Sequence, residues 1–249
     1  MVFQLGGVFM VSSFNRSPQR YVRMAGVFYL AIIALGLFGE VFVRGALVVS
    51  GDAAATAQRI ADSPLLWRMG IAGDLLMHVF DLPVIVVLYL LLRPVSKPLA
   101  LFTTLINVVQ TAVLALNKLN LVLPLLLLSG GSTLKTFTPE QLQSLAYLAI
   151  KAHSFGFGIG LIFFGVACVA RGYLIFASGF LPKALGGLLV VAGFSYLLNS
   201  FALLLAPALA SALFPYVLIP AFVGELLLAL WMIFKGVDLA RWRRVTATH

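Results

Sequence analysis

Six long hydrophobic stretches, separated by short polar segments, occupy nearly the whole chain of 249 residues. Each stretch contains roughly 20 or more mostly apolar residues, the length that an α-helix needs to cross the hydrocarbon core of a bilayer. Lipid offers no partner to a free backbone N–H or C=O group, so runs of this kind form helices. The pattern therefore predicts an all-α, polytopic membrane protein with six transmembrane helices in a bundle, over residues 24–49, 65–92, 98–128, 141–170, 183–206 and 216–235.

Glycine and proline mark the breaks between the stretches. Thr138, Pro139 and Gln141 follow the pattern of a helix cap with proline at the first helical position, which predicts the start of the fourth helix. No stretch is left over for a separate soluble domain. We predict an interfacial or disordered lead-in over residues 1–23, one six-helix transmembrane domain over 24–236, and a basic cytoplasmic tail over 237–249.

The composition supports a lipid environment and narrows the partners. The chain is 62% hydrophobic and 10% charged, whereas a soluble domain has about 45–50% apolar and about 25% charged residues. This excludes nearly all soluble enzyme folds. The 17 basic residues outnumber the 8 acidic ones, but they lie at helix ends, where anionic headgroups are found, so we assign the charge to the lipid bilayer and not to nucleic acid. The single Cys168 excludes an internal disulfide, and the oligomeric state stays open.

The distribution of basic residues predicts the orientation, because short loops rich in Lys and Arg stay in the cytoplasm. One set of connections holds only Arg59 and Lys135, with Arg68 just inside a helix. We therefore predict that both termini are cytoplasmic and that the loops at residues 50–64 and 129–140 face outside. The other set holds Arg16, Arg20, Arg23, Arg93, Lys97, Arg171, Lys183, Lys235, Arg241, Arg243 and Arg244.

Ionisable residues also occur inside the predicted spans, where each costs at least about 2.5–3.5 kcal/mol unless it finds a partner or a water-filled cavity. Glu40 and Arg44 are four residues apart, so they are expected to pair on one helix face, and Lys118 is expected to neutralise Asp74. Most of these groups fall between the midplane and the outer surface. We predict one outward-facing pocket lined by Glu40, Asp74, His78, Asp81, Lys118, His153 and Glu225.

The chemistry of this predicted pocket stays open at the level of sequence. Asp74, His78 and Asp81 follow an i, i+4, i+7 pattern that puts an imidazole between two carboxylates on one stripe. A divalent metal on His78, Asp81, His153 and Glu225 and a haem between the two histidines are alternatives, although the chain has no diagnostic ligand motif. Buried polar packing is the default. Gly156 and Gly160 have the spacing of close helix packing rather than of a phosphate loop.

Five segments of the chain carry a family resemblance. They are RMAGVFYL at 23–30, GEVFVRGALVVSGDAAATAQRIADSPLLWRMG at 39–70, LYLLLRPV at 88–95, FFGVACVARGYLIFASGFLPKALGGLLVVAG at 163–193 and GELLLALWMIFKGV at 224–237. Together they resemble a bacterial integral-membrane family catalogued as domain of unknown function number 4386, over roughly residues 20–240. The resemblance implies a multi-pass protein of the bacterial cytoplasmic (inner) membrane and brings no catalytic residue to assign.

Three function classes remain. The first is an uncharacterised membrane protein whose pocket binds or transports a small polar or amphipathic ligand. The second is an intramembrane, metal-dependent hydrolase that acts on lipid, in which the ion activates a water. The third is a structural or regulatory membrane subunit whose polar residues join the helices. Whether the protein is an enzyme, and which ligand it takes, cannot be read from the residues.

Overall fold

The computed structural model describes residues 12–131 and 134–247, and the chain is 87% helical. Among these described residues there is no strand, and six helices are long and apolar enough to cross a membrane. The predicted all-α class with six membrane-crossing helices is therefore confirmed. These helices are Pro18–Leu47, Pro64–Leu92, Lys97–Leu128, Pro139–Ser178, Lys183–Leu205 and Tyr216–Phe234.

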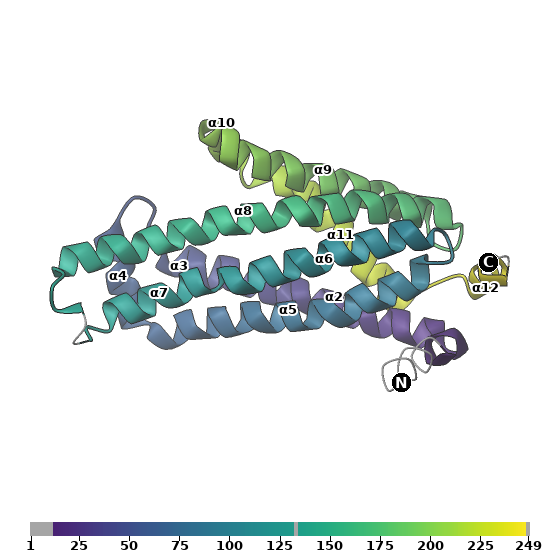
Figure 1. The fold of residues 1–249 in the computed structure, drawn as a ribbon, viewed down its shortest axis with the longest axis horizontal. Helices are drawn as coiled ribbons and strands as arrows, with labels where there is room; N and C mark the ends of the chain where they lie inside the picture. The colour runs from purple at the N-terminus through teal and green to yellow at the C-terminus, as the bar shows by residue number, and fades with distance from the viewer. Residues whose placement is uncertain (1–11, 132–133, 248–249) are drawn as a thin grey trace. The chain divides into compact units, whose positions relative to one another are not determined.

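Figure 1 labels the elements in chain order, from purple at the N-terminus to yellow at the C-terminus. Several of the membrane-crossing helices consist of more than one segment, and short helices lie in two of the connections. In order, the elements are α2 (Pro18–Leu37), the π-helix η1 (Phe38–Arg44), α3 (Gly45–Leu47), α4 (Ala53–Asp62), α5 (Pro64–Leu92), α6 (Lys97–Asn117), α7 (Leu119–Leu128), α8 (Pro139–Ser178), α9 (Lys183–Leu205), α10 (Pro207–Leu213), η3 (Tyr216–Leu218), α11 (Ile219–Phe234) and α12 (Leu239–Ala247).

The helix starts follow the residues that favour them. The backbone N–H of Thr138 donates to Gln141 Oε1 at 2.9 Å, and the Gln141 N–H donates to Thr138 Oγ1 at 3.3 Å. This reciprocal cap confirms the predicted start of the fourth membrane-crossing helix. In the first predicted outer loop, Asp52 Oδ1 accepts from the Ala55 N–H at 2.8 Å and caps α4.

Two predicted helix ends differ from the structure. The first membrane-crossing helix begins at Pro18 instead of residue 24, so it includes the end of the predicted lead-in; residues 1–11 of that lead-in lie outside the described residues. The fourth continues to Ser178 instead of ending at residue 170. Arg171, which the sequence placed in a loop, is buried within α8 and donates to Asn107 Oδ1. A buried amide satisfies the guanidinium, so the helix has no reason to end there.

The chain forms two compact units. In the described part of the chain, unit 1 comprises residues 12–31, 80–110 and 161–247, and unit 2 comprises residues 32–79 and 111–160. The helices α2, α5, α6 and α8 contribute residues to both units.

In unit 1 the end of α8 packs against α9 through two pairs of glycines (Figure 1). A Cβ atom on Gly172 would lie 2.6 Å from the Gly186 carbonyl oxygen, and a Cβ atom on Gly193 would lie 2.6 Å from the Gly165 carbonyl oxygen. Each pair therefore allows the two backbones to approach more closely than any side chain would permit. Gly224 of α11 approaches α9 in a similar way, since its Cβ would lie 3.0 Å from the Leu188 carbonyl oxygen.

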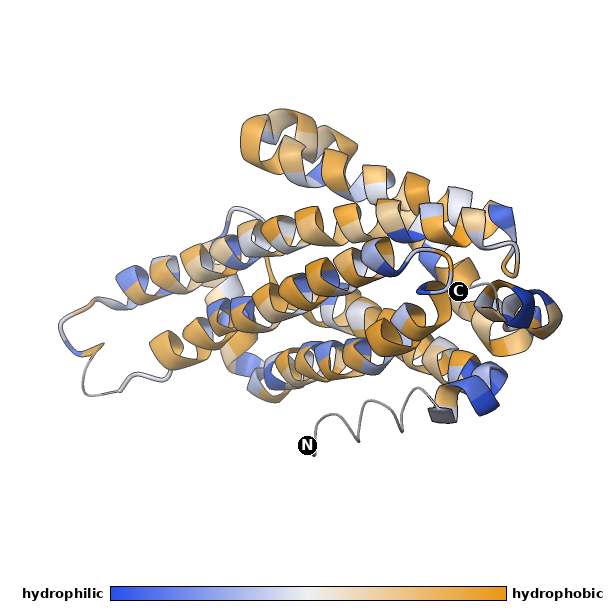
Figure 2. Cartoon of the chain, turned by 45° about the vertical axis from the view of Figure 1, so that its right-hand side comes forward, coloured by the Kyte–Doolittle hydropathy of each residue, from blue (hydrophilic) through white to orange (hydrophobic). Residues whose placement is uncertain are grey.

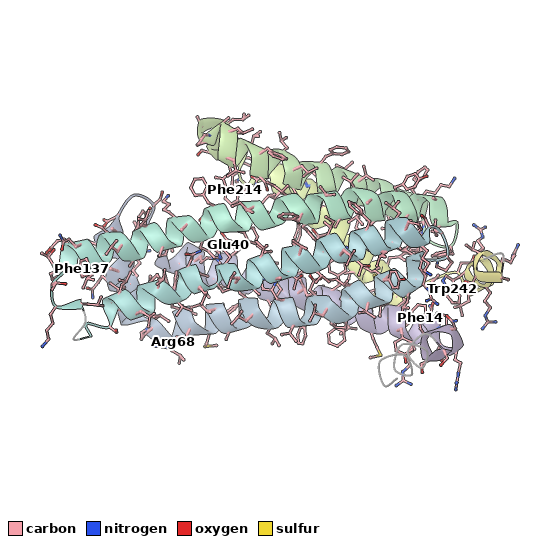
Figure 3. All side chains as sticks on the ribbon, viewed as in Figure 1. Phe14, Glu40, Arg68, Phe137, Phe214 and Trp242 are labelled. Atoms are coloured by element: carbon pink, nitrogen blue, oxygen red, sulfur yellow. The ribbon has the colours of Figure 1, made fainter. Side chains whose placement is uncertain are left out.

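The C-terminal helix α12 also packs within unit 1. Trp242 is 3% exposed, and its ring meets the Phe14 ring edge to face, with 5.8 Å between the ring centres (Figure 3). Its Nε1 donates to the Leu91 carbonyl oxygen at 3.3 Å. The predicted tail thus begins with an ordered helix that is fixed to the membrane-crossing helices by a buried tryptophan.

Unit 2 has its own apolar core around Trp67, whose Nε1 donates to the Leu121 carbonyl oxygen at 2.8 Å. Gly156 and Gly160 of α8 lie against Asn117 and Leu114 of α6, which confirms their predicted role in close helix packing. The buried members of the core are Val43, Leu47, Ile60, Trp67, Ile71, Leu121 and Ile150.

Many large apolar side chains of the membrane-crossing helices are exposed, and Figure 2 shows hydrophobic residues over most of each helix. Phe42, Leu65 and Phe234 have 64%, 69% and 70% of their surface uncovered. Exposed apolar surface on this scale is destabilising in water and favourable in lipid. The fold is therefore one whose helices face hydrocarbon.

Candidate functional site

The first membrane-crossing helix widens into a π-helix at Phe38–Arg44, and this segment carries two charged residues of unit 2. The Gly45 N–H donates to the Glu40 carbonyl oxygen, five residues back. Within the segment, a Cβ atom on Gly39 would run into Asp74 Oδ1 and the Arg44 guanidinium. Glycine at this position therefore lets α5 approach the ion pair closely. Short π-helical segments are rare and occur frequently at functional sites.

Asp74 of α5 is the centre of an ion-pair network. Its Oδ2 atom lies 2.7 Å from Arg44 Nη1 and 2.9 Å from Lys118 Nζ, so one oxygen accepts from two cations. Arg44 also donates through Nε to Glu40 Oε2 at 2.7 Å. Both pairs predicted from the sequence, Glu40 with Arg44 and Lys118 with Asp74, are confirmed.

Lys118 extends the network to α8. It lies at the break between α6 and α7, and its Nζ is 3.2 Å from His153 Nε2. Asn117 Nδ2 donates to the His153 carbonyl oxygen at 2.9 Å, and Asn120 Nδ2 donates to Asn117 Oδ1 at 2.9 Å. The two asparagines hold the imidazole-bearing turn of α8 beside the lysine.

The network is balanced in charge and buried over most of its length. Glu40 and Asp74 supply two carboxylates, while Arg44 and Lys118 supply two cations. The side chains of Asp74 and Lys118 are 1% and 3% exposed, whereas that of Glu40 is 62% exposed. Charges in a low-dielectric interior are tolerated when they are paired. The network thus runs from an exposed carboxylate to a buried carboxylate, a buried amine and a buried imidazole.

Two buried atoms of this region lack a hydrogen-bond partner among the described residues. They are Asp74 Oδ1 and His78 Nε2, which belong to residues one helical turn apart on α5. A buried polar atom left without a partner costs about 1–3 kcal/mol. Asp74 and His78 therefore offer polar atoms that the protein itself does not satisfy.

Unit 1 contains a second group of buried polar residues, centred on Glu225 of α11. Its Oε2 accepts from the Tyr29 hydroxyl at 3.0 Å, and its Oε1 accepts from the Tyr196 hydroxyl. The sequence reading did not include the two tyrosines, because an aromatic residue in an apolar stretch is read as packing. Their hydroxyl groups are the missed signal, since a buried tyrosine usually needs a hydrogen-bond partner.

Asn107 of α6 joins three other polar groups in unit 1. It accepts from Arg171, and its Nδ2 lies 2.7 Å from Gln110 Oε1 and 3.1 Å from Asp81 Oδ2. Asp81, which the sequence placed on one stripe with Asp74 and His78, thus has its amide partner in unit 1. Asn107 and Arg171 were both missed, Arg171 because it was assigned to a loop.

The seven predicted pocket residues are therefore divided between the units. Glu40, Asp74, His78, Lys118 and His153 belong to unit 2, whereas Asp81 and Glu225 belong to unit 1. The prediction that all seven line one pocket stays a prediction. Lys151 of α8 is exposed, and its Nζ lies 5.4 Å from the centre of the Tyr147 ring.

The metal prediction rested on His78, Asp81, His153 and Glu225. Within the described ranges, no three His, Cys, Asp or Glu side chains lie close enough together to hold an ion. The groups in contact with Asp74 are the cations Arg44 and Lys118, which do not bind a divalent metal. Metal and haem binding stay predictions, and the ligand site proposed for unit 2 does not depend on them.

Comparison with known proteins adds a family and one relative. The model of the family described as "Domain of unknown function (DUF4386)" matches residues 24–236, which include both polar groups. A protein of Archaeoglobus fulgidus described as "Uncharacterized protein" is 28% identical over 172 residues, covering 68% of this chain and 85% of the relative. No solved structure matches the chain.

Proposed function

The chain belongs to the DUF4386 family, and we propose that it binds a small polar or amphipathic ligand at the ion-pair network of unit 2 and moves it across the membrane. The proposal includes location in the bacterial cytoplasmic (inner) membrane with both termini in the cytoplasm. One observation carries the ligand site: Asp74 Oδ1 and His78 Nε2 are buried without a partner beside a carboxylate oxygen that two cations share.

The free atoms define the kind of group that the ligand presents. A carboxylate has about four acceptor positions, and on Asp74 both cations occupy the same oxygen. The other oxygen, Asp74 Oδ1, has no partner and can accept a hydrogen bond from a donor group of the ligand. Asp74 and His78 lie four residues apart on α5, so they face the same side of the helix. A ligand hydroxyl, amide or ammonium group fits this pair of atoms.

The network can also rearrange without leaving a bare charge. Arg44 has a second carboxylate in Glu40, and Lys118 has a second partner in His153. If a ligand bound at Asp74 Oδ1 draws the carboxylate away from the two cations, each of them keeps its other partner. A network with alternative partners can take more than one arrangement, which is a physical basis of a ligand-driven change. This property favours transport over static helix packing.

The experiment is native mass spectrometry of the full chain, purified in a neutral detergent. We expect a bound small molecule on the wild type and its loss in His78→Ala and Asp74→Asn, with helical content and monodispersity retained. The matched control is Ser200→Ala, because Ser200 Oγ is also buried without a partner but lies on α9 in unit 1. Glu225→Gln tests whether the second polar group shares the ligand.

Two outcomes contradict the proposal. If the wild type carries no small molecule and both variants only unfold, the network serves to join helices. If Ser200→Ala loses the ligand to the same extent as His78→Ala, the ligand does not sit at the network.

A further inference from the structure

A basic groove with a volume of about 580 Å³ opens on unit 1, and none of its lining residues belongs to either buried polar group. The start of α2, the end of α11 and α12 line it. Four of its lining residues are arginines, namely Arg16, Arg20, Arg23 and Arg243. Figure 2 shows the corresponding hydrophilic patches at the start of α2 and on α12.

The groove changes from basic to apolar along α2. Arg20, Arg23 and Val27 recur at spacings of three and four residues, which places them on one face of α2, and Arg16 lines the groove from the segment just before that helix. At about 1.5 Å per residue, the stripe from Arg20 to Val27 is about 10 Å long. Met24, Val27 and Ile233 form the apolar end, which lies within membrane-crossing segments. The groove therefore joins a cationic mouth to a hydrocarbon-facing wall.

The four arginines have no acidic partner in the described part of the chain. Asp238, which precedes the C-terminal helix, pairs with Arg241 at 3.3 Å. Residues 1–11 and 132–133 contain no Asp or Glu in the sequence. Four guanidinium groups around one groove repel each other unless an anion lies among them.

The walls of the groove are fixed by hydrogen bonds. Gln19 Nε2 donates to the Lys235 carbonyl oxygen at 2.7 Å, and Gln19 Oε1 accepts from the Val237 N–H at 2.9 Å. The amide thus ties α2 to the link between α11 and α12. Gly236 has a φ of +70° in that link, and a Cβ atom there would run into the Gln19 amide. This clamp and the buried Trp242 on α12 hold the segments that line the groove in place.

We propose that this groove binds one anionic phospholipid, with the headgroup phosphate among the four arginines and an acyl chain along Met24, Val27 and Ile233. Guanidinium groups pair with phosphate oxygens in a bidentate manner. Basic pockets between membrane helices recognise anionic headgroups on the cytoplasmic side, and these arginines belong to the set predicted to face the cytoplasm. The apolar wall favours a lipid over a free phosphate, because a free phosphate has no acyl chain to pack against it.

The test measures the thermal unfolding of the full chain in neutral detergent during titration with dioleoylphosphatidylglycerol. We expect this lipid to raise the unfolding temperature in a saturable way, whereas dioleoylphosphatidylcholine and inorganic phosphate leave it unchanged. The variant Arg16→Gln/Arg20→Gln/Arg23→Gln is expected to weaken phosphatidylglycerol binding roughly a hundredfold. The matched control, Arg93→Gln/Lys97→Gln/Lys183→Gln, removes the same charge from unit 1 outside the groove. We expect phosphatidylglycerol to raise its unfolding temperature as it does for the wild type.

A single substitution covers the case in which the triple variant does not fold. Arg243→Gln changes one exposed residue of α12 and is expected to weaken binding roughly fivefold. The proposal is overturned if phosphatidylglycerol produces no shift, if phosphatidylcholine matches it, or if inorganic phosphate alone gives the same shift. The proposal is also overturned if the groove variant and its charge-matched control lose affinity for phosphatidylglycerol equally. That result would indicate that the lipid is attracted to the basic surface as a whole.

Discussion

Gly39 is the residue at which the ion-pair network tolerates the least added volume. We expect Gly39→Ala to lower the free energy of unfolding by about 1–3 kcal/mol, the usual cost of overpacking, because its methyl group would displace Asp74 Oδ1 and the Arg44 guanidinium. The measurement is unfolding of the purified chain in detergent. Gly73→Ala on the same unit is the control, since its nearest neighbours lie 3.7 Å and 3.8 Å away. Equal stability of the two variants would contradict the close approach at Gly39.

Lys118 offers a second prediction at this scale. Lys118→Met leaves the Asp74 carboxylate with Arg44 alone and is expected to cost about 3 kcal/mol, the lower end of the range for a broken buried ion pair. The double variant Asp74→Asn/Lys118→Met should cost less than the sum of the single changes. Lys151→Met, at an exposed lysine, should change stability by less than about 0.5 kcal/mol. Additive effects of Asp74→Asn and Lys118→Met would show that the two side chains do not interact.

The sequence predicted pairs of residues better than it predicted their surroundings. Glu40 and Arg44 were identified from their spacing, and Lys118 with Asp74 from the cost of unpaired charge. Nothing in the apolar pattern showed that Gly39 makes room for Asp74, because the two are distant in the chain. The partners of Glu225 were hidden for another reason: Tyr29 and Tyr196 fit an apolar stretch equally well with a free or a bonded hydroxyl.

At the scale of elements, the α8–α9 hairpin explains a sequence segment that is typical of the family. The segment at residues 163–193 contains all four glycines of the two close contacts, spaced seven residues apart on each helix. Two pairs at that spacing lie on one face of each helix, about two turns apart. In this chain, these four positions serve the packing of two helices.

Gly186→Ala is the third prediction and tests this packing. A Cβ atom there would lie 2.6 Å from the Gly172 carbonyl oxygen and 2.6 Å from the Phe176 backbone nitrogen. Backbone atoms cannot rotate away, so we expect a loss near 3 kcal/mol in the free energy of unfolding. The neighbouring Gly187→Ala is the control, because no atom lies within 4 Å of its added methyl group. A hairpin held by other contacts would tolerate both substitutions equally.

Element ends and irregular turns were harder to predict than element existence. All six spans followed from length and hydropathy, which the membrane imposes on any helix. The π-helix at Phe38–Arg44 and the break at Lys118 were not predicted, because a local change in helical pitch leaves the apolar pattern nearly unchanged. The short helices α4 and α10 lie in segments that the sequence marked only as connections.

At the scale of the whole molecule, composition decides the class and leaves the ligand undecided. An apolar share of 62% is incompatible with a water-covered globule. The same share says nothing about which polar groups meet, because the few charged and amide side chains of the membrane-crossing helices can pair in many ways. The charge-balanced group of unit 2 and the tyrosine-bound carboxylate of unit 1 required the fold.

Orientation is the last prediction, and the chain provides a convenient way to measure it. Its single cysteine, Cys168, is 0% exposed, so a Cys168→Ala background allows one new cysteine to report alone. We expect a membrane-impermeant maleimide to label Lys135→Cys in intact cells and Lys97→Cys only after lysis, because basic loops are retained in the cytoplasm. Both positions are exposed, so a difference reports sidedness and not burial. Labelling of Lys97→Cys alone in intact cells would reverse the orientation and move the arginine groove to the outer leaflet.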